Sequence, residues 1–223
     1  MKIFIVNLLL ILLLASCSNT PELETGEIKT FQIIKKVINQ SNQEKIFVDA
    51  KKLLSRQQID SANIPVLFVE LPSGQNGTLT PYPGEGVGKT WLGADGATIT
   101  LEQGIVKASR GMGDDIMGSS PPMLQWARIE NSDPIYSREV KYITGNNKIS
   151  ERIFVCKIKK DNQKKIVTIW DVKFLTQRFD EMCNNDGFKI NNVYYVDDRG
   201  IVRKSSQYHS ETIGYIITER LDR

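Results

Sequence analysis

The amino-acid sequence predicts a mainly β protein: an antiparallel meander that forms a barrel-like or coiled sheet, with a short helical segment near the N-terminus. Two patterns predict this class. From residue 65 to the end, short runs rich in β-branched and aromatic residues alternate with turn residues at close spacing. Over residues 27–39, apolar side chains recur at helical spacing, as expected of a helix that covers one end of a sheet.

The first residues of the chain indicate export. Met1 and Lys2 precede an apolar run over residues 3–15, which is interrupted only by Asn7. A helix of this length spans roughly 20 Å, which is less than the ~30 Å of a bilayer's hydrocarbon core. A positively charged start, a short apolar run and small residues before the cut are typical of a cleaved signal peptide. We therefore predict a signal peptide over residues 1–16.

The apolar run ends in Leu14-Ala15-Ser16-Cys17, which is the residue order of a bacterial lipobox. We predict cleavage between Ser16 and Cys17 and attachment of a diacylglyceryl group to the thiol of Cys17. Two or three acyl chains anchor a protein stably to a membrane, whereas a single chain does so only marginally. The alternative is an ordinary signal peptide in which Cys17 is incidental.

Residues 17–26 are predicted to form a lipidated tether, and residues 27–223 a single mainly β periplasmic domain. The polar part of the tether, residues 18–26, reaches at most roughly 30 Å, which keeps the domain close to the bilayer. Ser18 follows the cysteine, at the position where lipoproteins retained in the inner membrane usually have Asp. This favours the outer membrane, with the domain facing the periplasm.

The predicted mature chain is nearly neutral. Of the 29 Lys and Arg residues, one lies in residues 1–16, which leaves 28 against 26 Asp and Glu, a net charge of +2. No basic tract typical of nucleic-acid or anionic-lipid binding stands out. The sequence therefore predicts no nucleic-acid partner, and a membrane partner only through the anchor on Cys17.

The other two cysteines, Cys156 and Cys183, form an even pair in an oxidising compartment, and we expect a disulfide between them. It would close a loop of about 27 residues and stabilise the fold by roughly 3.5 kcal/mol. Two buried free thiols are the alternative. The two cysteines lack C-x-x-C spacing and the single histidine, His209, lies far along the chain, so we predict no metal and no cofactor.

The expected strands follow one another from residue 65 onward, each ending at a turn. Turns are expected at residues 72–74, 95–96, 103–104, 160–162 and 197–200, where Gly, Asp, Asn and Pro gather. Residues 45–64 are compatible with short helices, and residues 176–182 with a helical or extended bridge. The expected strands cover residues 65–71, 91–94, 98–101, 105–109, 135–143, 149–158, 166–174, 193–196, 201–207 and 213–219.

Residues 84–90, GEGVGKT, are similar to a phosphate-binding loop but are one residue short of it. Pro83 stands where the first glycine of that motif belongs. The motif also needs a helix after it, whereas a strand and a turn are expected here. We interpret the stretch as a glycine-rich loop that enters a strand, and we predict no nucleotide partner.

Asp114 and Asp115 follow Arg110 at the end of an expected strand. Adjacent carboxylates in a strand point to opposite faces, so they form a poor acid/base pair unless the backbone bends. We expect solvated acids or a local ion pair with Arg110. Catalysis or contact with a glycan is the alternative for both acids.

Trp91, Trp126 and Trp170 are expected to pack in the core or on a sheet face. Stacking of Trp91 or Trp126 on a sugar ring is the alternative. His209 lies between Ser205 and Glu211, but the members of a catalytic triad come from separate segments that meet in space. We therefore expect His209 to be a surface residue.

Three stretches together resemble the YjbF/GfcB family of outer-membrane lipoproteins, which are associated with exopolysaccharide and group 4 capsule production. The third stretch departs from the family pattern at three positions. Where the family favours YWVD and SRQW, this chain has Tyr195, Ser206 and Tyr208, so aromatic character is kept at two positions and a basic residue is lost at one. The stretches are the lipobox at residues 14–17, residues 91–101 with their continuation to 115, and residues 183–208.

The resemblance implies an all-β fold with a small helical N-terminal part, no established enzymatic activity and genes that accompany polysaccharide export. We predict a non-enzymatic lipoprotein that assists the assembly or export of a surface polysaccharide, through contact with the glycan or with export proteins. One alternative is a polysaccharide-modifying enzyme whose acids include Asp114 or Asp115. Another is a purely structural envelope protein.

Overall fold

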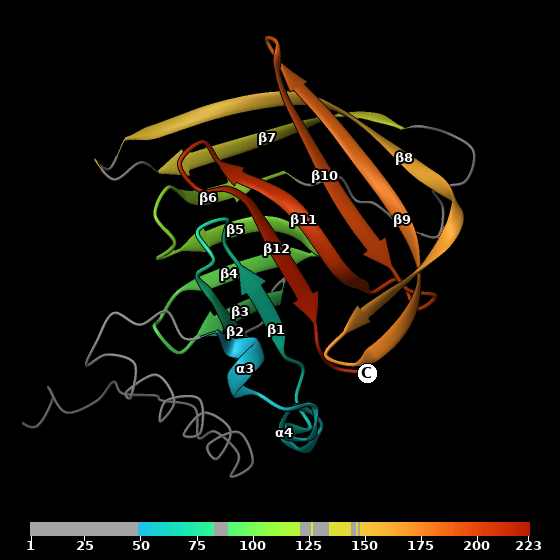
Figure 1. Cartoon of the computed structure of the whole chain (residues 1–223). Coiled ribbons are helices and arrows are strands. Elements are labelled where there is room, and N and C mark those ends of the chain that lie inside the picture. Colours follow the sequence, from blue (N-terminus) through green and yellow to red (C-terminus); the bar gives the residue numbers. More distant parts are fainter. Residues whose placement is uncertain (1–48, 83–88, 121–125, 127–133, 144–145, 147) are drawn as a thin grey trace, which may run out of the picture.

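In the computed structural model, residues 49–82, 89–120, 126, 134–143, 146 and 148–223 are described. Over these residues the chain forms two short helices and a twelve-stranded antiparallel sheet that curls into a nearly closed barrel (Figure 1). The prediction of a mainly β, barrel-like antiparallel sheet is confirmed. The predicted signal peptide, tether and helix over residues 27–39 lie outside the described residues.

The helices and strands have the following bounds. The helices are α3 (Ala50–Leu53) and α4 (Arg56–Ala62). The strands are β1 (Leu67–Glu70), β2 (Asn76–Pro81), β3 (Lys89–Gly93), β4 (Thr98–Glu102), β5 (Ile105–Arg110), β6 (Asp115–Ser119), β7 (Ile135–Ile143), β8 (Ile149–Ile169), β9 (Val172–Asn185), β10 (Phe188–Val196), β11 (Val202–Ser210) and β12 (Gly214–Arg220).

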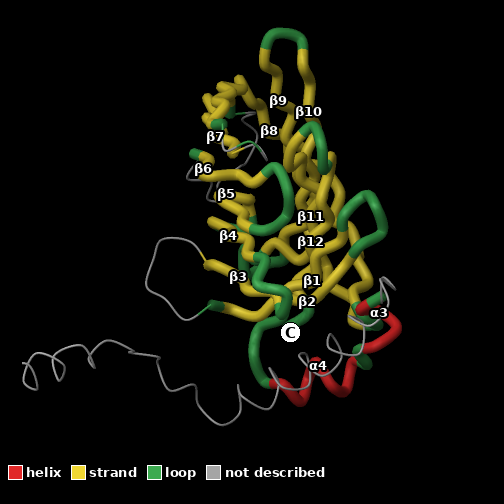
Figure 2. The backbone as a smooth tube through the Cα atoms, turned by 90° about the vertical axis from the view of Figure 1, so that its left-hand side faces the viewer, coloured by secondary structure: helices red, strands yellow, loops and turns green. Residues whose placement is uncertain are grey.

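The strand order shows how a meander closes on itself. It runs β5-β4-β3-β2-β1-β12-β11-β10-β9-β8-β7-β6, so nearly every strand pairs with its neighbour in sequence. The exception is β1 with β12, which joins the two ends of the meander in register from Leu67 opposite Arg220 to Glu70 opposite Ile217. The two edge strands are β5 and β6, and they lie side by side in both views (Figures 1 and 2).

The hairpin of β8 and β9 differs from the prediction. The expected turn at residues 160–162 is wrong, because β8 continues through this stretch as a bulge between Lys160 and Lys164. The Asp161 carboxylate accepts a hydrogen bond from the Gln163 amide at 3.1 Å, a local contact that accommodates the extra residues within the strand. The chain turns instead at residues 170–171, and residues 176–182 are part of β9 rather than a bridge.

Alternation along the strands separates two apolar regions. In β1, Leu67 and Val69 face the interior of the barrel, whereas Phe68 between them faces outward. Phe68 packs outside the barrel with Ile59 of α4, beneath the two helices. Figure 2 shows both helices at the end of the sheet opposite the β9–β10 turn.

Helix α4 begins at a capping box. The Ser55 side chain accepts from the Gln58 amide, and the Gln58 side chain accepts from the Ser55 amide, so two free donors of the first turn are satisfied. Asn63 ends the helix in a left-handed conformation. Arg56 then donates to the carbonyl of Leu221 at 2.7 Å, which fixes α4 against the end of the C-terminal strand.

Cys156 of β8 and Cys183 of β9 form a disulfide, as expected. The two residues are directly opposite in the strand register, with their Cα atoms 3.9 Å apart. Both are buried in the interior cluster. The bond therefore joins two adjacent strands inside the barrel.

Candidate functional site

The barrel interior encloses a carboxylate, that of Glu181 on β9, which is 0% exposed. Its Oε1 accepts a hydrogen bond from the Tyr136 hydroxyl at 2.6 Å. Its Oε2 accepts from Asn192 Nδ2 at 2.6 Å and from the Tyr194 hydroxyl at 2.7 Å. Arg138 of β7 completes the set, with Nη1 3.2 Å from Oε2. Four donors thus surround one buried negative charge.

Both members of this buried ion pair are held in their charged forms. Burial alone raises the pKa of Glu181, but the positive charge of Arg138 and the three hydrogen bonds outweigh it and lower that pKa below its ordinary value. Burial opposes the charge of Arg138 as well, and Glu181 outweighs it and raises the Arg138 pKa. The pair is therefore ionised at neutral pH.

The same network closes the seam between the two edge strands. Arg138 Nη2 donates to the Val106 carbonyl of β5 at 3.2 Å, and Gln207 Oε1 of β11 accepts from the Val106 amide at 2.9 Å. Gln207 Nε2 also donates to the Gly104 carbonyl at 2.9 Å. The Val106 groups lie at the free edge of β5 and the Gly104 carbonyl lies in the turn before it, so buried side chains replace the missing strand ladder. The Glu181 network is thus a structural element of the barrel wall.

A second set of hydrogen-bonded polar side chains crosses the seam between β5 and β6. Its members are Ser109, Asp115 and His209. The Ser109 hydroxyl donates to Asp115 Oδ1 at 3.1 Å and accepts from the Ile116 amide at 3.0 Å. His209 Nε2 lies 2.9 Å from the same hydroxyl oxygen. Because the one hydroxyl hydrogen points to Asp115, Nε2 is the donor and Nδ1 carries the lone pair. Nδ1 is buried and has no hydrogen-bond partner among the described residues.

His209 is 0% exposed, so its expected surface position is wrong. Strand alternation explains the error, because His209 follows Ser205 and Gln207 at every second position of β11, on the buried face. Burial lowers the pKa of His209 to about 4, although the nearby Asp115 and Asp114 oppose this. The imidazole is therefore neutral at neutral pH. Ser109 is buried as well, so the three residues do not form a solvent-accessible triad.

The two adjacent acids have separate structural partners. Asp115 accepts from the amides of Gly111 at 2.8 Å and Met112 at 3.1 Å, and so fixes the β5–β6 turn. Asp114 accepts from the Thr212 hydroxyl. The expected ion pair with Arg110 is not observed among the described residues, and that side chain instead donates to the Ile116 carbonyl at 2.8 Å. Arg110 therefore joins β5 to β6 across the seam.

The tryptophan rings named as candidate glycan contacts lie in the core. Trp91 is 1% exposed and Trp126 is 5% exposed. The ring of Trp126 packs 5.1 Å from the rings of both Phe179 and Tyr194, and its Nε1 donates to the Gln103 carbonyl at 3.0 Å. The expected packing role fits this burial, whereas stacking on a sugar needs an exposed ring face.

A half-enclosed cavity of about 290 Å³ lies at one end of the barrel, where β12 ends and β1 and β11 begin. This end is close to the C-terminus in Figure 1. The apolar part of its lining includes Leu67, Leu101 and Val202, and the polar part includes Thr218 and Arg220. An apolar hollow with a few polar groups is the usual form of a small-molecule site.

The β4–β5 turn forms one side of this cavity. Gln103 and Gly104 both have positive φ, 51° and 84°, as a two-residue hairpin turn requires. A Cβ on Gly104 would lie 2.3 Å from Val202 Cγ2, so only glycine allows the turn to approach β11 this closely.

The charge of the cavity comes from Arg220. Its guanidinium lies over the ring of Trp91, 4.8 Å from the ring centroid. Its Nε and Nη2 donate to the two carboxylate oxygens of Asp222 at 2.8 Å each. The side chain is 17% exposed, so the guanidinium can meet a ligand from solvent.

The sequence interpretation missed Glu181, Arg138 and Arg220. A signal for Glu181 was present, because Phe179 and Cys183 stand two residues to either side and strand alternation places all three on one face. No local pattern brings Arg220 to Trp91, because their contact depends on the pairing of β1 with β12 at opposite ends of the sheet meander.

Some predicted site residues fall outside the described structure. These are Ser16 and Cys17, together with residues 84–88 of the glycine-rich loop. The described part of the chain contains no helix that is long and apolar enough to cross a membrane.

Comparison with known proteins places this barrel in a class of bacterial lipoproteins. The family described as group 4 capsule polysaccharide lipoprotein gfcB, YjbF matches residues 39–221. The chain therefore belongs to the YjbF family, which confirms the resemblance. Membership of a lipoprotein family implies a membrane-associated location in the cell envelope.

A solved structure shares the fold. It is the hypothetical lipoprotein YmcC from Escherichia coli (K12), with a TM-score of 0.68 and 15% sequence identity. The similarity covers 78% of this chain and 93% of the other. A search among curated proteins found no match.

Proposed function

We propose that this protein is an outer-membrane lipoprotein that faces the periplasm and assists the assembly or export of a surface polysaccharide without catalysing a reaction. The observation that carries the proposal is the family match over residues 39–221, whose description names a capsule polysaccharide lipoprotein. The lipobox at residues 14–17 supports attachment through a diacylglyceryl group on Cys17.

The geometry supports a non-enzymatic role. Glycoside hydrolysis needs two carboxyl groups about 5–10 Å apart across a cleft. Asp115 instead fixes a turn, Asp114 binds Thr212, and Glu181 is enclosed by four donors. Each of these acids has a structural partner, so the enzyme alternative gains no support from them.

Deletion of the gene tests the polysaccharide role. Under conditions in which the strain makes its surface polysaccharide, we expect the deletion to reduce the cell-surface amount and a plasmid copy to restore it. Incubation of the purified domain with isolated polysaccharide should leave polymer size and composition unchanged. Normal surface polysaccharide in the deletion strain would contradict the role, and a shortened or altered polymer would contradict its non-enzymatic part.

A further inference from the structure

The cavity at the β12 end of the barrel has the size of a site for one small ligand. Pockets for small molecules measure about 300–1,000 Å³, so about 290 Å³ accommodates a single ring rather than a stretch of polymer. Ile201 and Leu101 offer apolar surface to a ring face, and Gln103 in the β4–β5 turn offers an exposed amide beside it. This combination suits a sugar, which has an apolar face and a polar edge.

Arg220 determines the charge of the preferred ligand. It is the cationic member of the cavity lining, and a guanidinium binds carboxylates through two parallel hydrogen bonds. The bidentate contact with Asp222 already uses one such pair of donors. Asp222 occupies Nε and Nη2, whereas Nη1 donates to no other described residue. We therefore expect a ligand carboxylate to accept a hydrogen bond from Nη1.

We propose that this cavity binds one acidic sugar residue, with the sugar carboxylate accepting from Arg220 and the ring against the apolar surface of Leu101 and Ile201. The choice of a sugar rests on the proposed function in polysaccharide assembly or export. The choice of an acidic sugar rests on Arg220. The site would give the protein a direct contact with a carboxylated glycan.

The test is a titration of the purified periplasmic domain, followed by NMR through the indole resonances. Glucuronate is the probe and glucose is the control, because the two differ only at C6, where glucose has a hydroxymethyl group in place of the carboxylate. We expect saturable shifts of the Trp91 indole with glucuronate and at least about tenfold weaker binding of glucose, since a hydrogen bond to a charged group is lost. Acetate should also bind at least about tenfold more weakly, because it lacks the ring.

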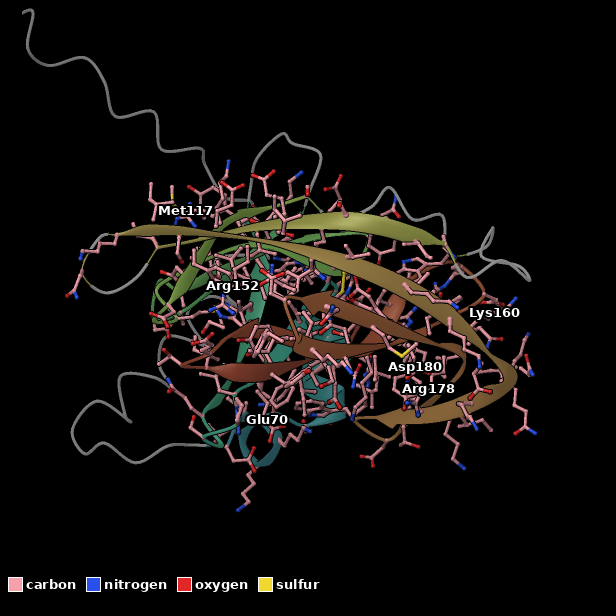
Figure 3. The ribbon with its side chains drawn as sticks, turned by 90° about the horizontal axis from the view of Figure 1, so that it is seen from above. Glu70, Met117, Arg152, Lys160, Arg178 and Asp180 are labelled. Atoms are coloured by element: carbon pink, nitrogen blue, oxygen red, sulfur yellow. A yellow bond between two sulfur atoms is a disulfide. The ribbon has the colours of Figure 1, made fainter. Side chains whose placement is uncertain are left out.

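Two arginine variants distinguish binding in the cavity from general electrostatic attraction to the protein surface. Arg178 is a matched control, because it binds Asp180 two residues on, as Arg220 binds Asp222, but on β9 near the bend of β8 (Figure 3). We expect Arg220→Gln to weaken glucuronate binding at least about tenfold and Arg178→Gln to leave it unchanged. Asp222→Asn should tighten binding severalfold, because it removes a competing carboxylate.

A cavity-filling variant keeps the test valid if Arg220→Gln fails to fold. Ile201 lines the cavity from the β10–β11 turn and is not part of the Arg220 ion pair. Ile201→Trp should abolish the indole shifts while circular dichroism remains that of the wild type. The proposal is overturned if glucuronate gives no saturable shift, if glucose or acetate binds as tightly as glucuronate, or if folded Arg220→Gln or Ile201→Trp protein binds glucuronate like the wild type.

The outcomes also separate this inference from the proposed function. Failed glucuronate binding together with reduced polysaccharide in the deletion strain would overturn the inference alone. Normal polysaccharide in the deletion strain together with glucuronate binding would overturn the proposed function and leave a sugar-binding domain.

Discussion

At the scale of single residues, the barrel depends on polar side chains that it has enclosed. Glu181 and Arg138 face each other in the interior, and Arg138 and Gln207 bind the free backbone edge at Val106. Removing one partner of a buried ion pair leaves the other charge uncompensated, which costs far more than the pair contributes.

Substitution of Glu181 should therefore be strongly destabilising. Glu181→Gln keeps the shape but leaves the Arg138 charge unpaired, so we expect the free energy of unfolding to fall by about 3–5 kcal/mol. Glu151→Gln is the control, because that exposed carboxylate lies 3.7 Å from Lys141 and should contribute less than about 1 kcal/mol. Urea unfolding of both variants measures the difference. Equal, small losses would show that the network is not needed for stability.

His209 should make stability fall in mild acid. Its pKa is lowered from 6.5 to about 4 in the fold, so between these values the unfolded chain binds a proton that the folded chain does not. Stability is full above pH 6.5 and is lost as the pH falls towards 4. From pH 7 to pH 5 the expected loss is about 2 kcal/mol.

His209→Gln provides the comparison, because glutamine can still donate to Ser109 but does not titrate. We expect the free energy of unfolding, measured in urea, to fall less between pH 7 and pH 5 in the variant than in the wild type, by about 2 kcal/mol. The same dependence in both proteins would assign the acid sensitivity to other groups.

At the scale of elements, the sequence indicates strands and turns better than their extents. The strand over residues 135–143 and the turns at Gly74 and residues 197–200 lie where they were expected. β2 and β6 were missed, because the short run of β2 contains Gly77 and Pro81 and that of β6 contains Gly118. Residues 160–162 have turn composition, but pairing with β9 on both sides keeps them in a strand.

The β4–β5 turn provides a test of close packing by glycine. Gly104→Ala places a methyl group against Val202, whereas Gly96→Ala meets no atom within 4 Å at a similar positive φ of 88°. Backbone strain should lower the free energy of unfolding of both variants by about 1 kcal/mol. Overpacking against Val202 should lower that of Gly104→Ala by about a further 1–3 kcal/mol. Thermal or urea unfolding of the pair measures the excess. Equal losses in the two variants would show that β11 shifts to accommodate the methyl group without a loss of stability.

The disulfide between β8 and β9 should stabilise the hairpin. The double substitution Cys156→Ala/Cys183→Ala removes the cross-link between two residues that are 27 apart in the sequence. We expect the free energy of unfolding to fall by about 3.5 kcal/mol. Reductant should lower the stability of the wild type and leave the double variant unchanged. A double variant as stable as the oxidised wild type would contradict this role.

At the scale of the whole molecule, strand pairing and family membership give a consistent account. The β1–β12 pairing closes a meander of local hairpins, and buried side chains at the seam replace a ladder between β5 and β6. Composition and turn spacing predict a barrel-like sheet, but periodicity within a strand contains no information on which distant strands meet. The cavity and its Arg220 therefore emerge only from the assembled fold.

The measurement that tests the account most directly is the amount of surface polysaccharide in a deletion strain that carries wild-type protein, Cys17→Ser protein or an empty vector. Membrane fractionation and immunoblotting of the same cells show where each protein lies. We expect full polysaccharide with the wild type and a marked loss with the vector. Cys17→Ser protein should leave the membrane fraction and restore little. Equal surface polysaccharide in all three strains would contradict the account.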